Sequence, residues 1–120
     1  MTKILIAEDE RDIRELVGFT LEHNGYSVVS SADGLSALEL TASEHPDLVL
    51  LDVRMPRLDG YEVCRRIKAD PQLKHIPVVF LSAKGQEAEV QAGIDAGAQA
   101  YILKPFSMSE LINQIQQTLG

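Results

Sequence analysis

The fold of this chain can be predicted from one stretch near its middle, Asp47-Leu48-Val49-Leu50-Leu51-Asp52-Val53-Arg54-Met55-Pro56. Its four consecutive aliphatic residues, 48–51, are typical of a strand that is buried on both faces, as strands of a parallel sheet are. Asp52 directly follows the apolar run, and residues 53–56 are typical of a turn. The stretch therefore predicts a buried strand with a carboxylate at its carboxyl end.

Further apolar runs resemble this one: residues 4–7, 78–81 and 101–103, with a weaker run at 26–29. Between the runs, apolar residues recur at the spacing of a helix face. The helical spacing runs through Ile13, Leu16, Val17 and Leu21; Leu35, Leu38 and Ala42; Val63 and Ile67; Val90 and Ile94; and Leu111, Ile112, Ile115 and Leu119. Strand and helix alternate five times, which predicts right-handed βαβ crossovers and an α/β fold with helices on both faces of a parallel sheet.

Composition narrows the class of protein. The 120 residues correspond to a single domain over 1–120, with 45% apolar and 24% charged residues, as in globular proteins. A formal net charge of −7, with the basic residues scattered, argues against direct nucleic-acid binding. Cys64 is the single cysteine, and no stretch has the length of a signal peptide or a membrane span, so we expect a cytoplasmic protein that does not insert into membranes.

Polar residues follow the apolar runs at positions where ligands bind in such folds. Glu8 and Asp9 come after the first run, Asp52 after the third, Ser82 after the fourth and Lys104 after the last. The carboxyl ends of parallel strands share one edge of the sheet, so these five side chains are expected to converge there. Carboxylates from two strands suit Mg²⁺, and a hydroxyl and an ammonium suit a phosphoryl group.

Each of these residues also has an ordinary explanation. The acidic residues near Asp9 favour the positive end of a helix dipole, with Asp9 as the N-cap. Asp52 and Ser82 are common in turns and bends, and Lys104 is a plausible solvated cation. The ordinary explanations do not require all of these residues to meet at one edge. Together the residues indicate phosphoryl transfer to or from an aspartate.

The motifs resemble those of the receiver domain of two-component response regulators, of the single-domain chemotaxis and phosphorelay type, over essentially the whole chain. The matching motifs are Lys3-Ile4-Leu5-Ile6-Ala7-Glu8-Asp9, the stretch Asp47 to Pro56 with Asp59-Gly60, Val79-Phe80-Leu81-Ser82-Ala83, Gly97-Ala98, and Tyr101-Ile102-Leu103-Lys104-Pro105-Phe106. The resemblance implies a flavodoxin-like, CheY-like (βα)5 fold with strand order 2-1-3-4-5. It also implies that residues 1–120 form one receiver domain without an output domain.

The resemblance assigns roles to residues at that edge. Asp52 would accept a phosphoryl group from a sensor histidine kinase or a histidine phosphotransfer protein. Glu8, Asp9, Asp52 and the backbone carbonyl of Arg54 would hold Mg²⁺ or Mn²⁺. Many relatives have Asp-Asp where this chain has Glu8-Asp9. The longer Glu8 side chain is expected to reach the metal through a water molecule, which would change the metal affinity.

The resemblance also implies a switch. Ser82 and Lys104 would grip the phosphoryl oxygens, and Tyr101 would turn inward and change the surface of the fourth helix, fifth strand and fifth helix. Arg54 and Lys84, two residues beyond Asp52 and Ser82, would tune hydrolysis. The protein would then be no enzyme beyond its own phosphorylation and dephosphorylation.

Two details depart from or extend the pattern. The last two helices carry glutamines where receivers attached to winged-helix DNA-binding domains usually carry a charged dimer face, which argues against that dimer mode. The resemblance suggests a cis Lys104–Pro105 bond, which sequence alone leaves undecided.

Three alternatives belong to other classes. A phosphatase of the haloacid dehalogenase kind also uses a strand-end aspartate, but requires an acid where this chain has Arg54. A flavodoxin-like cofactor binder requires a phosphate-binding loop, and neither G-x-G-x-x-G nor a Walker loop occurs. The third alternative is the receiver part of a larger transcription factor or cyclase.

Overall fold

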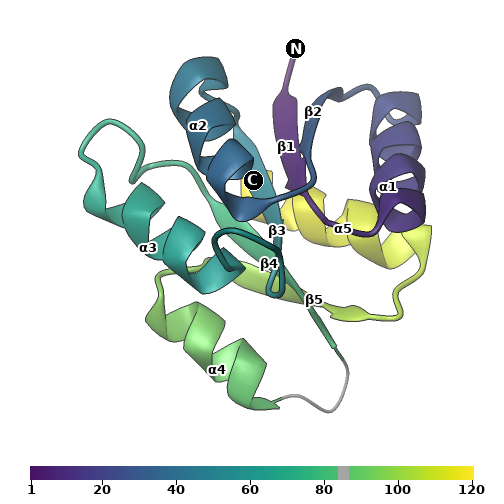
Figure 1. Cartoon of the computed structure of the whole chain (residues 1–120). Coiled ribbons are helices and arrows are strands. Elements are labelled where there is room, and N and C mark those ends of the chain that lie inside the picture. The colour runs from purple at the N-terminus through teal and green to yellow at the C-terminus, as the bar shows by residue number, and fades with distance from the viewer. Residues whose placement is uncertain (84–86) are drawn as a thin grey trace.

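The computed structural model describes residues 1–83 and 87–120 and contains a five-stranded parallel sheet with five helices (Figure 1). The elements in chain order are β1 Lys3–Ala7, α1 Arg11–His23, β2 Ser27–Ser31, α2 Gly34–Glu44, β3 Leu48–Asp52, α3 Gly60–Ala69, β4 Val78–Ala83, α4 Glu87–Asp95, β5 Ala100–Lys104 and α5 Met108–Leu119. The strand order is β2-β1-β3-β4-β5. The predicted α/β fold and strand order are therefore confirmed.

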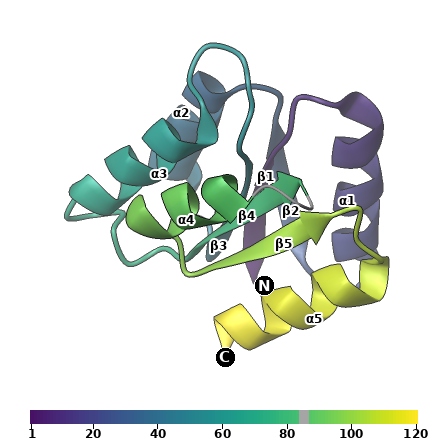
Figure 2. The same cartoon turned by 90° about the horizontal axis from the view of Figure 1, so that it is seen from below.

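The sheet separates two layers of helices. Helices α1 and α5 cover one face, and α2, α3 and α4 cover the other, as the two perpendicular views show (Figures 1 and 2). All five residues of β3 are buried, and β1 is buried from Ile4 onward. The apolar runs read from the sequence thus correspond to central strands that are covered on both sides.

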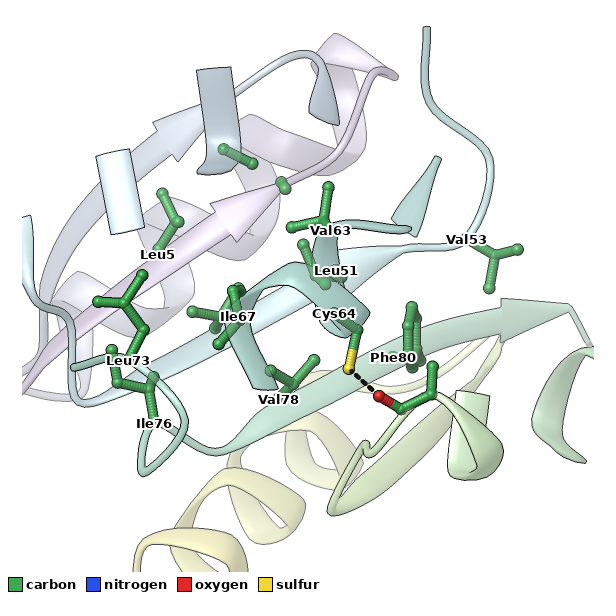
Figure 3. Close-up of a cluster of buried hydrophobic side chains, with 14 residues drawn as sticks. Leu5, Leu51, Val53, Val63, Cys64, Ile67, Leu73, Ile76, Val78 and Phe80 are labelled. Atoms are coloured by element: carbon green, nitrogen blue, oxygen red, sulfur yellow. Dashed lines mark hydrogen bonds between the residues drawn. The ribbon is translucent and has the colours of Figure 1, made fainter. Parts of the chain in front are cut away.

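Two apolar cores result, one on each face. The α1–α5 face packs Val17, Leu21, Leu111 and Ile115 against β1, β3, β4 and β5. On the other face Val63, Cys64 and Ile67 of α3 belong to one cluster with Phe80 of β4, which lies beside Cys64 (Figure 3). The Cys64 thiol donates to the carbonyl of Ala96 at 3.4 Å, and burial raises the pKa of Cys64 to about 11. Cys64 is therefore a packing residue.

Several helix positions differ from the sequence analysis. Asp9 is not the N-cap of α1: that position is Glu10, whose side chain makes no capping hydrogen bond. Leu16, Leu35 and Ile94 have helical spacing but remain 53%, 37% and 48% exposed. Spacing identifies a helix face, whereas burial depends on how far the neighbouring elements extend over that face. Among the described residues, no helix has the length and apolar character needed to cross a membrane.

The start of α3 fixes the end of β3, and with it the position of Asp52. The Gly60 amide donates to the carbonyl of Val53 at 2.9 Å, and a Cβ added to Gly60 would collide with the carbonyl oxygen of Asp52. It would also lie 3.0 Å from the ring of Phe80. Glycine is required here because two backbone segments approach too closely for a side chain.

We predict that Gly60→Ala lowers the free energy of unfolding by about 1 to 3 kcal/mol, the usual cost of overpacking, because neither the Asp52 backbone nor Phe80 has room to move away. Gly18→Ala is the matched control. A Cβ on Gly18, in the middle of α1, would make ordinary contacts of 3.7 Å with Ile6 and 3.8 Å with Val28. That variant should be neutral or slightly more stable because alanine favours helix. Equal urea midpoints for the two variants would contradict the prediction.

Candidate functional site

Lys104 at the end of β5 contacts Asp52 at the end of β3 and Glu8, which directly follows β1, at one edge of the sheet. Its ammonium donates to Glu8 Oε1 at 2.9 Å and to Asp52 Oδ1 at 3.2 Å. The Glu8 side chain is fully buried, and those of Asp52 and Lys104 are 12% and 22% exposed. Asp52 and Lys104 are the last residues of β3 and β5, so their position follows directly from where these strands end.

Burial and charge shift the protonation of this cluster. Burial, reinforced by a hydrogen bond with Asp52, raises the pKa of Glu8 to about 7 despite the nearby Lys104. Burial lowers the pKa of Lys104, but the hydrogen bond to Glu8 and the charge of Asp52 outweigh it, so this pKa lies above its ordinary value. Lys104 is therefore charged at neutral pH, whereas Glu8 holds a proton more readily than an ordinary glutamate does.

The same edge offers a set of oxygen ligands. Glu8, Asp9 and Asp52 each provide a carboxylate oxygen, and these atoms lie within 4.8 Å of one another. Glu8 and Asp52 are buried, whereas Asp9 is exposed. Hard carboxylate oxygens with one open side fit Mg²⁺, which retains several waters and recruits phosphate oxygens. The residues present therefore fit the metal that the sequence analysis predicted.

A cavity of about 300 Å³ adjoins these carboxylates. Its lining residues are Asp9, Glu10, Asp52, Val53, Arg54, Glu89 and Lys104. The structure thus brings Glu8, Asp9, Asp52 and Lys104 together, with Arg54 at the rim. A cavity with acidic walls and one central ammonium suits a phosphoryl group accompanied by a divalent cation.

Ser82 lies in β4, beside Leu103 of β5 in the sheet register. Its Oγ is buried and has no hydrogen-bond partner within the described residues, the one such side-chain atom in residues 1–83 and 87–120. Leaving a buried hydroxyl unpaired costs about 1 to 3 kcal/mol. A ligand oxygen that reaches Ser82 would recover this cost.

The remaining predicted residues have different surroundings. Tyr101 on β5 is 41% exposed and does not point into the core. The Lys104–Pro105 bond is cis, as the resemblance suggested. The side chain of Arg54 is 84% exposed and pairs with Glu89 at 3.4 Å. Lys84 lies outside the described residues.

Glu89 is a site residue that the sequence analysis missed. It belongs to α4, its side chain is only 12% exposed, and it lines the cavity together with Asp52. The sequence shows an acidic first turn with Glu87 and Glu89 but does not indicate which of the two turns toward the site.

Comparison with known proteins decides the family. The family model described as the response regulator receiver domain matches residues 4–116 of this chain. The chain belongs to the response regulator receiver domain family. It is 44% identical over 117 residues to the response regulator MprA of Mycolicibacterium vanbaalenii, a match that covers 98% of this chain and 50% of MprA. The receiver domain thus spans about half the length of the curated relatives it matches.

Solved structures agree with this assignment. The chemotaxis response regulator CheY4 of Vibrio cholerae is 31% identical, with a TM-score of 0.93 over 98% of each chain. The receiver domain of NtrX from Brucella abortus is 36% identical, with a TM-score of 0.90 over 97% of each chain. This receiver domain therefore shares its fold with CheY4 and with the receiver domain of NtrX.

We predict that millimolar Mg²⁺ raises the melting temperature, because three carboxylates lie close together and the Lys104 ammonium contacts only two of them. Two like charges about 4 Å apart at an effective dielectric of 20 repel by roughly 4 kcal/mol before relaxation. Asp52→Asn should therefore raise the melting temperature in EDTA and reduce the gain from Mg²⁺. Asp95→Asn, on the exposed end of α4, should behave as the wild type. Melting curves of the wild type that coincide with and without Mg²⁺ would argue against a shared metal site.

Proposed function

We propose that this receiver domain accepts a phosphoryl group on Asp52 from a phosphohistidine of a sensor histidine kinase or histidine phosphotransfer protein, in a Mg²⁺-dependent reaction. The observation that carries the proposal is the arrangement around Asp52. Its carboxylate contacts Lys104, shares a ligand cluster with Glu8 and Asp9, and borders a cavity. This arrangement supports nucleophilic attack by Asp52.

In the transfer, an Asp52 carboxylate oxygen attacks phosphorus and forms a P–O bond as the P–N bond to the donor imidazole breaks. The electron pair of that bond leaves with the imidazole nitrogen, which takes up a proton from solvent. Glu8, Asp9, Asp52 and the Arg54 carbonyl would hold Mg²⁺, which when bound supplies positive charge to the phosphoryl oxygens. The domain acts on itself rather than turning over a substrate.

Lys104 and Ser82 would bind the product. Lys104 is already charged beside Asp52, so it requires no proton uptake to pair with an arriving phosphoryl oxygen. The unpaired Ser82 hydroxyl would donate to a second oxygen. Its movement would open space for the exposed ring of Tyr101 to turn inward and alter the surface of α4, β5 and α5.

Arg54 and Lys84 would set the lifetime of the aspartyl phosphate. Arg54 borders the cavity, and Lys84 holds the corresponding position two residues beyond Ser82 in the sequence. A cation shields phosphoryl oxygens but accepts no proton from an attacking water.

The buried thiol of Cys64 suits a reducing compartment, so we place the protein in the cytoplasm.

Intact-mass analysis with acetyl phosphate and Mg²⁺ tests the function. We predict that the wild type gains one phosphoryl group, whereas Asp52→Asn gains none because its carboxamide is not a nucleophile. Asp95→Asn serves as the control and should react as the wild type does. A phosphoryl group on Asp52→Asn, or its absence from the wild type with Mg²⁺ present, would overturn the assignment of Asp52.

A second candidate is the receiver part of a longer regulator. The observation in its favour is that this domain matches only 50% of MprA. In that case the altered surface of α4, β5 and α5 would act on a neighbouring domain of the same chain rather than on a separate protein. The length of the mature protein, measured by mass in its native cells, distinguishes the two candidates.

A further inference from the structure

Arg54 and Glu89 connect the loop after β3 to helix α4. Arg54 follows the proposed phosphoacceptor by two residues, and its Nη2 lies 3.4 Å from Glu89 Oε2. Both residues line the cavity at Asp52. Asp9 and Asp52 border the same cavity. Within the part of the chain that the structure describes, however, the carboxylate that lies within 4.0 Å of the Arg54 guanidinium is that of Glu89.

Glu89 has a second contact with the same region of the chain. Its backbone carbonyl accepts a hydrogen bond from the Tyr61 hydroxyl at 3.1 Å. The Tyr61 ring packs against Phe80 of β4, with 5.5 Å between ring centroids. The first turns of α4 are therefore tied to α3 through the backbone of Glu89, and to the phosphorylation loop through its side chain.

A phosphoryl group on Asp52 would compete with Glu89 for the guanidinium of Arg54. A phosphoryl group carries about −1.5 to −2 charges and three acceptor oxygens, going by phosphorylated hydroxyl side chains, whereas Glu89 carries one charge and two oxygens. Guanidinium groups bind phosphate in a bidentate, charge-assisted geometry. Because Arg54 is 84% exposed, its side chain is free to rotate toward a new anion at little steric cost.

We propose that Glu89 is a positioning residue that holds Arg54 at the mouth of the cavity until a phosphoryl group on Asp52 takes over the guanidinium. The exchange breaks the Arg54–Glu89 ion pair and places the Glu89 carboxylate near a second anion, which repels it. Both effects loosen α4. The inference rests on the proposed function of Asp52 and adds a second connection between the site and α4, independent of Ser82 and Tyr101.

Amide hydrogen exchange of residues 87–95, measured by mass spectrometry with Mg²⁺, with and without acetyl phosphate, tests the exchange of partners. In the wild type, phosphorylation should speed exchange in α4 by roughly two- to five-fold, the effect of losing a partly exposed ion pair. In Glu89→Gln, α4 should exchange faster before phosphorylation and gain little more after it. Glu87→Gln, the same substitution on the exposed side of the same turn, should respond as the wild type does.

The variant Arg54→Gln distinguishes two roles of Glu89: positioning the Arg54 guanidinium, and stabilising α4 without any part in the response to phosphorylation. If the ion pair transmits the signal, Arg54→Gln should also remove the response of α4 to phosphorylation. Because Arg54 would also set the lifetime of the aspartyl phosphate, the comparison with the wild type is made at equal phosphorylated fraction. If α4 in phosphorylated Arg54→Gln responds as in the wild type, the proposal is wrong. Intact mass is recorded on the same samples, so a failure of Asp52 to acquire phosphate would instead overturn the proposed function.

Discussion

The ammonium of Lys104, shared between the carboxylates of Glu8 and Asp52, is the interaction on which the rest of the site depends. Neighbouring strands lie about 4.8 Å apart, so β5, separated from β3 by β4, is about 10 Å from it. A long side chain at the end of β5 is required to cross that distance. Lys104 pairs in the sheet register with Ala83, the last residue of β4, and its side chain crosses the end of that strand to reach Asp52.

This arrangement leaves the site incomplete without a ligand. Three carboxylates cluster at this edge, the Lys104 ammonium contacts two of them, and a buried hydroxyl at Ser82 lacks a partner within the described residues. A core built for stability alone would avoid both features, since buried charges and unpaired polar atoms are costly. A cation that neutralises the carboxylates and a phosphoryl group that pairs with Ser82 and Lys104 would satisfy both. The same features that cost stability in the absence of a ligand would thus favour binding of a cation together with a phosphoryl group.

Much of this could be predicted from the sequence because it depends on periodicity and on strand ends. The aliphatic run at 48–51 identifies a central strand, and parallel strands bring their carboxyl ends to one edge, so the convergence of Asp52 and Lys104 follows without a structure. Glu89 could not be predicted, because the rotation of α4 against the sheet depends on packing with α3 and β4. The ordinary explanation of Asp9 as a helix cap fails for a related reason: an acidic run shows that a helix begins nearby but not which residue caps it, and the N-cap of α1 is Glu10.

The proposed function requires one geometry, in which Asp52 binds a phosphoryl group between a divalent cation and Lys104. A crystal structure of the protein with Mn²⁺ and beryllofluoride, which mimics a phosphoryl group on a carboxylate, measures this directly. The account predicts an anomalous Mn²⁺ peak bounded by Asp9 and Asp52, the beryllium on an Asp52 oxygen, and fluorides within hydrogen-bond distance of Lys104 Nζ and Ser82 Oγ. Beryllofluoride on any other carboxylate, or Mn²⁺ away from this cluster, would contradict it.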